Sequence, residues 1–588
     1  MDETLLLTSI ALFTLLAGVC SIIFNKAKLP PLIGYLTAGI VIANAFTVDE
    51  TGMSAIEILS DFGLVLLMFC IGLEINLKKI RKQGSFAILV VITQLPLTVL
   101  FGTIAGNIMG FDAIQSIVLG TVLSGCSTAA VMSVMTSQKT FSKEHINTIV
   151  LIIIMQDIGQ VIMLSILTPV LAGSTMEVSG LVVLITSIAI FMVASIAIGL
   201  RYIPTLINKI ADNVPSEILI VFSVGLAFFM AWLATIAGLS MAIGAFIMGL
   251  LMSSARNSES INSSVEPMKN LFMAMFFISV GMEVHLATLG ANIGTILIFY
   301  LLFAGFLVIT VFLGFWLGAK KGKIGFMSAI GMTAMGEFAF IISKEALDYG
   351  VVTENFYTSI IGAALLSMIC MPILSRYSEW LWDKGSKMTP AKLKDRFDRV
   401  NESRDYLYDS VKETTKKTQK KFRKSMTHAY INFMAIVIIE IIFFVAVPVI
   451  SPILSDMYGG NPHLWDFALV MLNFVVLIPP TDYLVDNVKF FDDIINETSK
   501  QGASKELDAM NRGKRYQELL AINEYIAVVI IDLIIIAVVP NPLSLAEHIF
   551  VALAAIVILF LILRRIKNRN KGLALEDGDE TLEPIKED

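Results

Sequence analysis

One carboxylate stands out because it lies in the middle of an apolar stretch. Residues 146–171 are about as long as a membrane span, and Asp157 is the only acidic residue between Glu144 and Glu177. Counting about 1.5 Å per residue places Asp157 about 16 Å deep, near the bilayer centre. Carboxylates at this depth are rare and by default mark an ion or proton pathway. The alternative is a protonated, hydrogen-bonded aspartate with a structural role.

Polar side chains accompany this acid along its helix. Gln156 precedes Asp157, and Gln160 and Ser165 follow at helical spacing on an otherwise apolar segment. The Gln156 side chain offers a neutral carbonyl oxygen and cannot itself carry a proton.

Two clusters of small and hydroxyl residues are expected to interrupt other helices at mid-span. The first consists of Ser124, Gly125, Cys126, Ser127 and Thr128. The second, residues 331–337, lies seven helices later, so the two interrupted helices run in opposite directions. An inverted repeat of this kind brings two broken helices together at the midplane, where exposed carbonyls and helix ends form an ion site. Small-residue patches for close helix packing are the alternative.

Two further acids fall within or beside the expected helices. Glu337 lies about 13 residues into its helix, where it could line the pathway, stabilise the break or bond a neighbouring amide. Glu74 lies at the end of a helix before a basic run, and we interpret it as a solvated helix-end residue.

Composition sets the class of protein. In a chain of 588 residues, 56% are hydrophobic and 16% are charged, which is typical of a polytopic membrane protein and not of a soluble one. No basic run indicates nucleic acid. The four cysteines lie in apolar runs, so neither a disulfide nor a metal cluster is indicated. No pairing of nucleophile and base and no nucleotide loop is present, so we expect neither an enzyme nor a cofactor.

Apolar runs and basic connections predict the membrane topology. We expect an all-α protein with helices at about 1–23, 32–45, 56–77, 86–109, 114–135, 146–171, 181–200, 219–237, 241–252, 271–281, 293–317, 324–346 and 356–374. Every second connection is basic, and the others are neutral or acidic, which indicates an outside N-terminus.

The remainder of the chain divides into three parts. Residues 379–426 are expected to form a basic cytoplasmic linker with helical propensity, and residues 571–588 an acidic, disordered tail. Between them, residues 427–570 carry about four further membrane helices and a charged cytoplasmic loop at 482–518, which leaves the C-terminus inside. The acids inside these runs are Glu440, Asp466 and Asp532, and a helix-packing role is the simplest interpretation of Asp532.

Seven motifs together resemble a known family. They are LIGYLTAGI (32–40), FCIGLE (69–74), residues 123–131, MQD (155–157), GLSMAIGAF (238–246), FFISVGM (276–282) and GEFAF (336–340). In this order they resemble the second superfamily of monovalent cation:proton antiporters, and Kef-type potassium/proton antiporters are the nearest likeness. The resemblance covers about residues 1–380, so residues 1–378 are expected to form the antiporter domain.

The resemblance implies a mechanism as well as a fold. It implies a homodimeric, elevator-type transporter of the cell membrane in which Asp157 binds a proton or a monovalent cation in turn, since each expels the other. The expected ion- and proton-binding residues are Asp157, Gln156, Ser124, Ser127 and Thr128, and the expected residues of the second break are Thr333, Gly336 and Glu337. No Lys or Arg occurs between Asn270 and Ala319, so no buried countercharge is expected there and exchange should be electroneutral.

Several alternatives stay open from the sequence. Kef-type proteins commonly carry a soluble dinucleotide-binding domain, which is not found in this sequence, so a separate regulatory subunit could supply any nucleotide control. A cation channel or a non-transporting membrane sensor could use the same scaffold. The choice between K⁺ and Na⁺ depends on cavity geometry, although the likeness favours K⁺.

Overall fold

The structure is a computed structural model in which two compact units, Met1–Thr389 and Pro390–Asp588, are distinguished. It describes residues 3–27, 29–46, 50–75, 85–137, 141–173, 178–318 and 320–388, and single residues and short runs between 424 and 483. The expected linker beyond residue 388, the loop 482–518, Asp532 and the tail 571–588 lie almost entirely outside the described residues.

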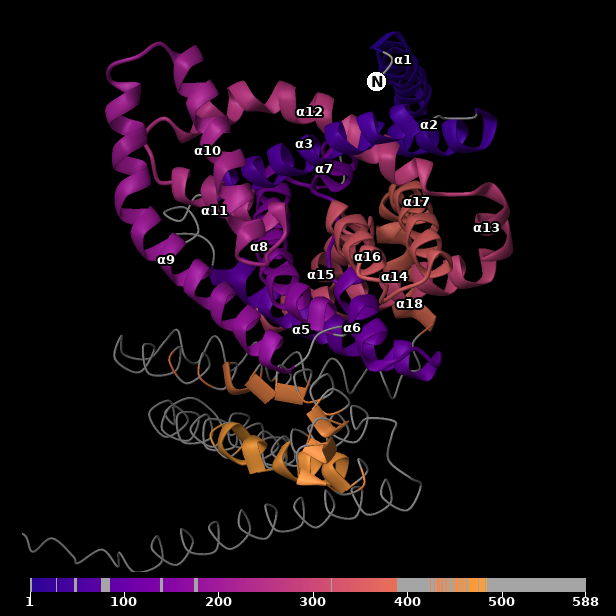
Figure 1. Ribbon diagram of the computed structural model, residues 1–588. Helices are drawn as coiled ribbons and strands as arrows, with labels where there is room; N and C mark the ends of the chain where they lie inside the picture. The colour runs from indigo at the N-terminus through magenta and orange to yellow at the C-terminus, as the bar shows by residue number, and fades with distance from the viewer. Residues whose placement is uncertain are drawn as a thin grey trace, which may run out of the picture. The chain divides into compact units, whose positions relative to one another are not determined.

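The secondary structure of the described part of the first unit is helical apart from one isolated bridge, and its helices form two groups (Figure 1). One group, called the scaffold here, contains α1 (Glu3–Lys26), α2 (Pro31–Ala45), α3 (Glu50–Glu74), α9 (Val178–Ala211), α10 (Ser216–Ile236), α11 (Met241–Met252) and α12 (Ser258–Met282). Within it, α3 packs against both α11 and α12, and α2 lies between α1 and α12.

Glycines let the scaffold backbones touch. A Cβ at Gly72 would lie 2.4 Å from the carbonyl oxygen of Phe246, and one at Gly249 would lie 2.1 Å from that of Phe69. The same close approach joins Gly39 on α2 to Gly281 on α12. Small residues allow membrane helices to pack at this distance. These contacts hold α3 against α11 and α2 against α12 within the scaffold.

The second group, called the core here, carries the interrupted helices. It contains α5 (Ser85–Ile108), α6 (Ala113–Val122), α7 (Thr128–Ser137), α8 (Lys143–Gly173), α14 (Ile293–Leu317), α15 (Gly322–Gly331), α16 (Glu337–Asp348) and α17 (Glu354–Arg376). Helix α14 packs against α5, α15 and α17, while α5 also packs against α6 and α8. The short α13 (Leu286–Ala291) connects α12 to this group.

Scaffold and core share little backbone contact. Helix α8 approaches α3, α9 and α11, and α12 meets α16 through side chains, including Phe277 and Phe340 with ring centroids 5.6 Å apart. The interface between the groups is therefore looser than the packing within either one.

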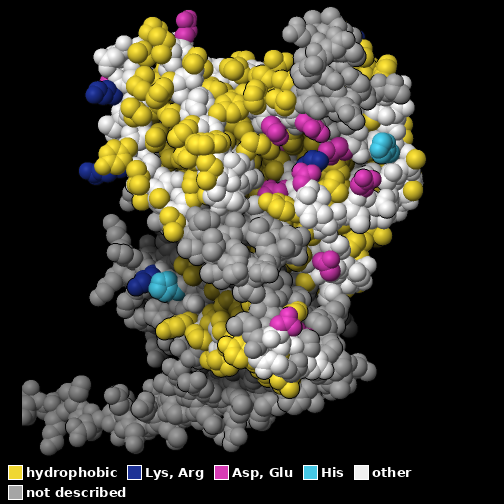
Figure 2. All heavy atoms as spheres, viewed as in Figure 1, with side chains coloured by type: hydrophobic (Ala, Val, Ile, Leu, Met, Phe, Trp, Pro, Cys, Tyr) yellow, Lys and Arg dark blue, Asp and Glu magenta, His cyan; other side chains and the backbone are white. Residues whose placement is uncertain are grey.

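The surface of the first unit matches a lipid environment. Large apolar side chains such as Val221, Phe229, Trp232 and Ile198 are more than half exposed on α9 and α10, and apolar side chains cover much of the visible face (Figure 2). Among the described residues, seven helices are long and apolar enough to cross a membrane by length and composition. One of these seven, Leu464–Thr481, belongs to the second unit.

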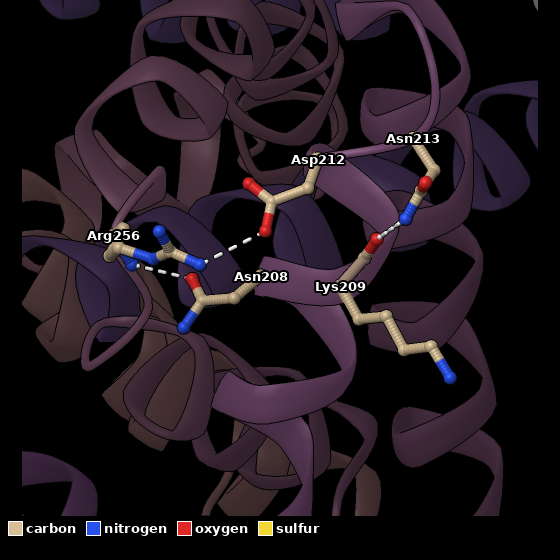
Figure 3. A network of polar contacts seen from close by, with 5 residues as sticks. All are labelled: Asn208, Lys209, Asp212, Asn213 and Arg256. Atoms are coloured by element: carbon tan, nitrogen blue, oxygen red, sulfur yellow. Dashed lines mark hydrogen bonds and ion pairs between the residues drawn. The ribbon is translucent and has the colours of Figure 1, made fainter.

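An ion pair and a hydrogen bond connect two segments at one end of the scaffold. The Arg256 guanidinium lies 3.1 Å from Asp212, and its backbone N–H donates to the Asn208 side chain at 2.8 Å (Figure 3). Both members of the ion pair are well exposed, so its energetic contribution is small. It holds the turn after α11 against the end of α9.

Two boundaries differ from the sequence-based expectation. Helix α12 begins at Ser258 and not near residue 271, so Lys269 lies within it. The first residues of the expected linker form α18 (Ser378–Met388), which packs on α15 through an ion pair between Lys323 and Glu379 at 2.7 Å. Hydropathy detects lipid-buried segments, and it does not detect helices that continue into polar sequence.

The described residues of the second unit include two buried acids. Glu440 accepts hydrogen bonds from the Asn473 amide at 3.2 and 3.3 Å, and Asp466 is also buried. The carboxylate of Glu440 therefore has a defined partner inside this unit.

Candidate functional site

The two interrupted helices cross at their breaks. Residues 123–127 separate α6 from α7, and residues 332–336 separate α15 from α16. The Ser127 backbone N–H donates to the Ala334 carbonyl at 2.8 Å, and Cys126 and Met335 form an isolated antiparallel bridge. Antiparallel crossing is the arrangement expected for an inverted repeat.

The crossing leaves no room for a larger residue at Gly336. A Cβ there would lie 2.7 Å from the Cys126 carbonyl oxygen and 2.9 Å from its carbonyl carbon. The Met335 backbone N–H, next to it, donates to the Ser367 hydroxyl of α17 at 2.9 Å. Gly336 is thus required by the close approach of the two breaks.

The hydroxyl residues of the clusters satisfy the helix ends at the breaks. The Ser124 hydroxyl donates to the Thr121 carbonyl at 2.7 Å, and the Thr333 hydroxyl donates to Ile330 at 2.8 Å. The Ser127 hydroxyl accepts from the Ala130 backbone N–H at 3.3 Å at the start of α7. These bonds supply partners that helix termini otherwise lack in a membrane interior.

Asp157 lies beside this crossing on α8. Its side chain is only 6% exposed, and the Thr128 hydroxyl, in the first turn of α7, donates to its Oδ2 at 3.1 Å. Glu337 is the first residue of α16 and follows Gly336, which lies against the Cys126 carbonyl at the crossing. Each half of the repeat therefore supplies one acidic residue at or beside the crossing.

Gln156 is held in a network that ties three helices and one break together. Its Oε1 accepts from the Cys126 thiol at 2.7 Å, and its Nε2 donates to the Gln94 side chain on α5 at 2.8 Å. Gln94 donates in turn to the Ser124 carbonyl at 2.7 Å, and it also contacts Thr98, whose hydroxyl meets that of Thr310 on α14. In this conformation both ends of the Gln156 amide are occupied by protein groups.

Sequence reasoning did not identify Gln94. Its signal was a buried amide inside an apolar helix, two residues before Pro96, but a single glutamine has no spacing pattern that predicts its partner. All eight residues expected at the site or its breaks nevertheless lie on α8 or at the two breaks: Asp157, Gln156, Ser124, Ser127, Thr128, Thr333, Gly336 and Glu337.

Scaffold charges reach the same region. The positive charge of Lys269 on α12 acts on Glu74 and on Glu337, and Glu74 itself is exposed at the end of α3. Because α12 begins at Ser258, Lys269 lies within this helix and not in the connection before it.

Comparison with known proteins shows the family that the chain resembles. The model of the transmembrane sodium/hydrogen exchanger family matches residues 11–376. K(+) efflux antiporter 5 of Arabidopsis thaliana is 25% identical over 379 residues, which are 63% of this chain and 66% of that protein. The Na(+)/H(+)-K(+) antiporter GerN of Bacillus cereus is 27% identical over 386 residues, 64% of this chain and 96% of that protein.

A solved structure shares the fold. The sodium proton antiporter MjNhaP1 from Methanocaldococcus jannaschii superposes with a TM-score of 0.53 at 16% identity, over 65% of this chain and 98% of that one. The chain spans only 60–66% of the length of three Arabidopsis relatives, K(+) efflux antiporters 4, 5 and 6. Because the family model matches well over half of its 588 residues, the chain belongs to the transmembrane sodium/hydrogen exchanger family.

Proposed function

We propose that the protein is a secondary active antiporter that exchanges a monovalent cation for protons at Asp157. The observation that carries this proposal is a buried carboxylate that accepts a hydrogen bond from the Thr128 hydroxyl, beside two broken helices that cross at their breaks. One carboxylate binds either a proton or a cation, so neither can cross without displacing the other. Coupling then needs no second binding site.

The transported cation is proposed to be K⁺ in preference to Na⁺. Three of the most similar relatives are named as K⁺ efflux antiporters, and the sequence motifs favour the same group. GerN is named for both ions, so Na⁺ belongs in every assay.

Alternating access is proposed to occur by movement of the core against the scaffold. The glycine crossings hold the scaffold together, and the polar network around Gln156 holds the core together. Two contacts join the scaffold to the core at α12 and α16. One is the contact between the Phe277 and Phe340 rings, and the other is the ion pair of Glu283 with Lys344 at 2.5 Å. These side-chain contacts can break without unfolding either group.

The Lys344 ion pair lies in an acidic surface region. Lys344 also pairs with Asp348 at 3.0 Å, and the charges of Lys344 and Asp348 act on Asp61 of α3. Figure 2 shows acidic side chains gathered around a basic one on the visible face of this unit. We propose that this region is the outer mouth of the pathway, closed in the conformation described.

Further features of the proposal concern stoichiometry and assembly. Exchange is electroneutral if Asp157 is the only group that changes protonation. We also propose that the protein forms a homodimer in the cell membrane, with its N-terminus outside and its C-terminus in the cytoplasm. A separate regulatory subunit is proposed as well.

Proton flux in liposomes tests the function. Purified protein is reconstituted with an internal pH-sensitive dye, and K⁺ or Na⁺ is added outside. The wild type should move protons in response to cation, Asp157→Asn should not, and Ser223→Ala, a scaffold variant that loses only a bond to its own helix, should behave as wild type. A wild type that responds to neither cation would favour the sensor, and cation flux without proton flux would favour a channel.

A further inference from the structure

Gln160 is a buried amide with no partner at either end. It lies on α8, one turn beyond Asp157, and its side chain is 0% exposed. Neither its Oε1 nor its Nε2 has a hydrogen-bond partner in the described structure. Buried polar groups are almost always satisfied, so an amide left open on both sides indicates a group that it meets in another state.

The amide faces the first break. A Cβ at Gly125 would lie 1.9 Å from the Gln160 Oε1 and 2.1 Å from its Nε2, so the amide lies directly against this glycine. Asp157 faces Thr128, three residues further along the same break region. Since residues three apart share one side of a helix, the two α8 side chains are presented to one stretch of backbone.

The chemistry of the amide suits a cation and not a proton. A carboxamide oxygen is a hard, neutral ligand of the kind that alkali ions accept in place of water, and it does not titrate. The neighbouring Gln156 differs, because its two amide atoms are already bonded to Cys126 and Gln94. Of the two glutamines on this face, only Gln160 has an amide oxygen without a hydrogen-bond partner in the described structure.

We propose that the Gln160 side-chain oxygen is a second ligand of the transported cation, acting with Asp157 and setting affinity for the ion without taking part in proton binding. This inference rests on the proposed antiport function. It explains why residue 125 is glycine, since any side chain there would push the amide out of position.

The test compares cation and proton dependence in variants of Gln160. Gln160→Met keeps the length and removes the oxygen, and it should raise the apparent KM for K⁺ about tenfold, as expected for a lost polar contact to a charge, with kcat changed little. Gln160→Glu keeps an oxygen and should restore cation affinity. Gln115→Met, the same substitution on α6 away from the site, should leave KM unchanged.

Gly125→Ala provides an independent variant. Its Cβ would displace the Gln160 amide, so it should raise KM as Gln160→Met does, and combining the two should add little. Cation-induced thermal stabilisation of the detergent-solubilised protein, measured for all variants, reports binding without transport.

The outcomes separate the inference from the function on which it rests. If wild type exchanges cation for protons, Asp157→Asn abolishes exchange, and Gln160→Met leaves KM and thermal stabilisation unchanged, the inference is wrong and the antiport function stands. An equal loss of kcat in Gln160→Met and Gln160→Glu with no change in KM would also overturn it, because that pattern indicates a packing role. If wild type shows no exchange, the proposed function itself fails.

Discussion

Removing the hydroxyl that Thr128 donates to Asp157 should weaken cation binding only where protons compete. The bond, at 3.1 Å, favours the ionised carboxylate, whether it is empty or holds a cation, over the protonated one. Thr128→Val keeps the shape of the side chain and removes the donor. The proton then competes more strongly, while the intrinsic affinity of the carboxylate for the cation is unaffected.

The size of the effect follows from the type of bond. A hydrogen bond to a charged group contributes about 1.5–3 kcal/mol, and each 1.4 kcal/mol is a factor of ten. At acidic pH the apparent KM for K⁺ should therefore rise about 10- to 150-fold. As pH rises and protons cease to compete, the KM of the variant should converge on that of wild type.

The assay is the KM for K⁺ in liposomes, measured at several pH values for wild type, Thr128→Val and Thr128→Ser. The serine variant keeps the hydroxyl and should follow wild type. A KM raised equally at every pH would refute the reasoning, because it would mean that Thr128 binds the cation directly. An unchanged KM at acidic pH would show that the hydroxyl has no effect on the carboxylate.

Three further perturbations test other parts of the account. Gly336→Ala introduces a Cβ 2.7 Å from the Cys126 carbonyl oxygen, so it should abolish exchange or lower the melting temperature, while Gly225→Ala, at an open position, should do neither. Lys344→Gln removes the ion pair with Glu283 between core and scaffold, so labelling of a cysteine placed at the proposed outer mouth should become faster; unchanged labelling would place the closing contact elsewhere. Net current in liposomes under opposed K⁺ and proton gradients should be negligible, and a sizeable current that follows transport would reject electroneutral exchange.

Much of the site could be predicted from residue types and spacing. A lone acid at mid-span is energetically costly, so the sequence singles out Asp157. Two clusters of helix-weakening residues in oppositely directed helices have few structural explanations, so the sequence also predicts both breaks. Their antiparallel crossing at Cys126 and Met335 is consistent with that prediction. The roles of the individual residues remain proposals that the variants above test.

The residues that bond to the site or lie near it could be predicted less well from the sequence. Gln94 is a single amide in an apolar helix, and its bonds to Gln156 and Ser124 depend on how α5 packs against α8 and the break. Lys269 lies outside the expected helix 271–281 because the polar residues before it have low hydropathy, although α12 continues through them. Tertiary packing and helix continuation are properties that residue patterns along one segment do not contain.

The central claim is that one carboxylate holds either a cation or a proton, and proton release on cation binding tests it most directly. K⁺ is added to detergent-solubilised protein in weakly buffered solution near the pH at which exchange is half-maximal, and the protons released are counted against the cation bound. The account predicts a stoichiometric release from wild type and none from Asp157→Asn. Cation binding with no proton release, or release that persists in Asp157→Asn, would contradict it.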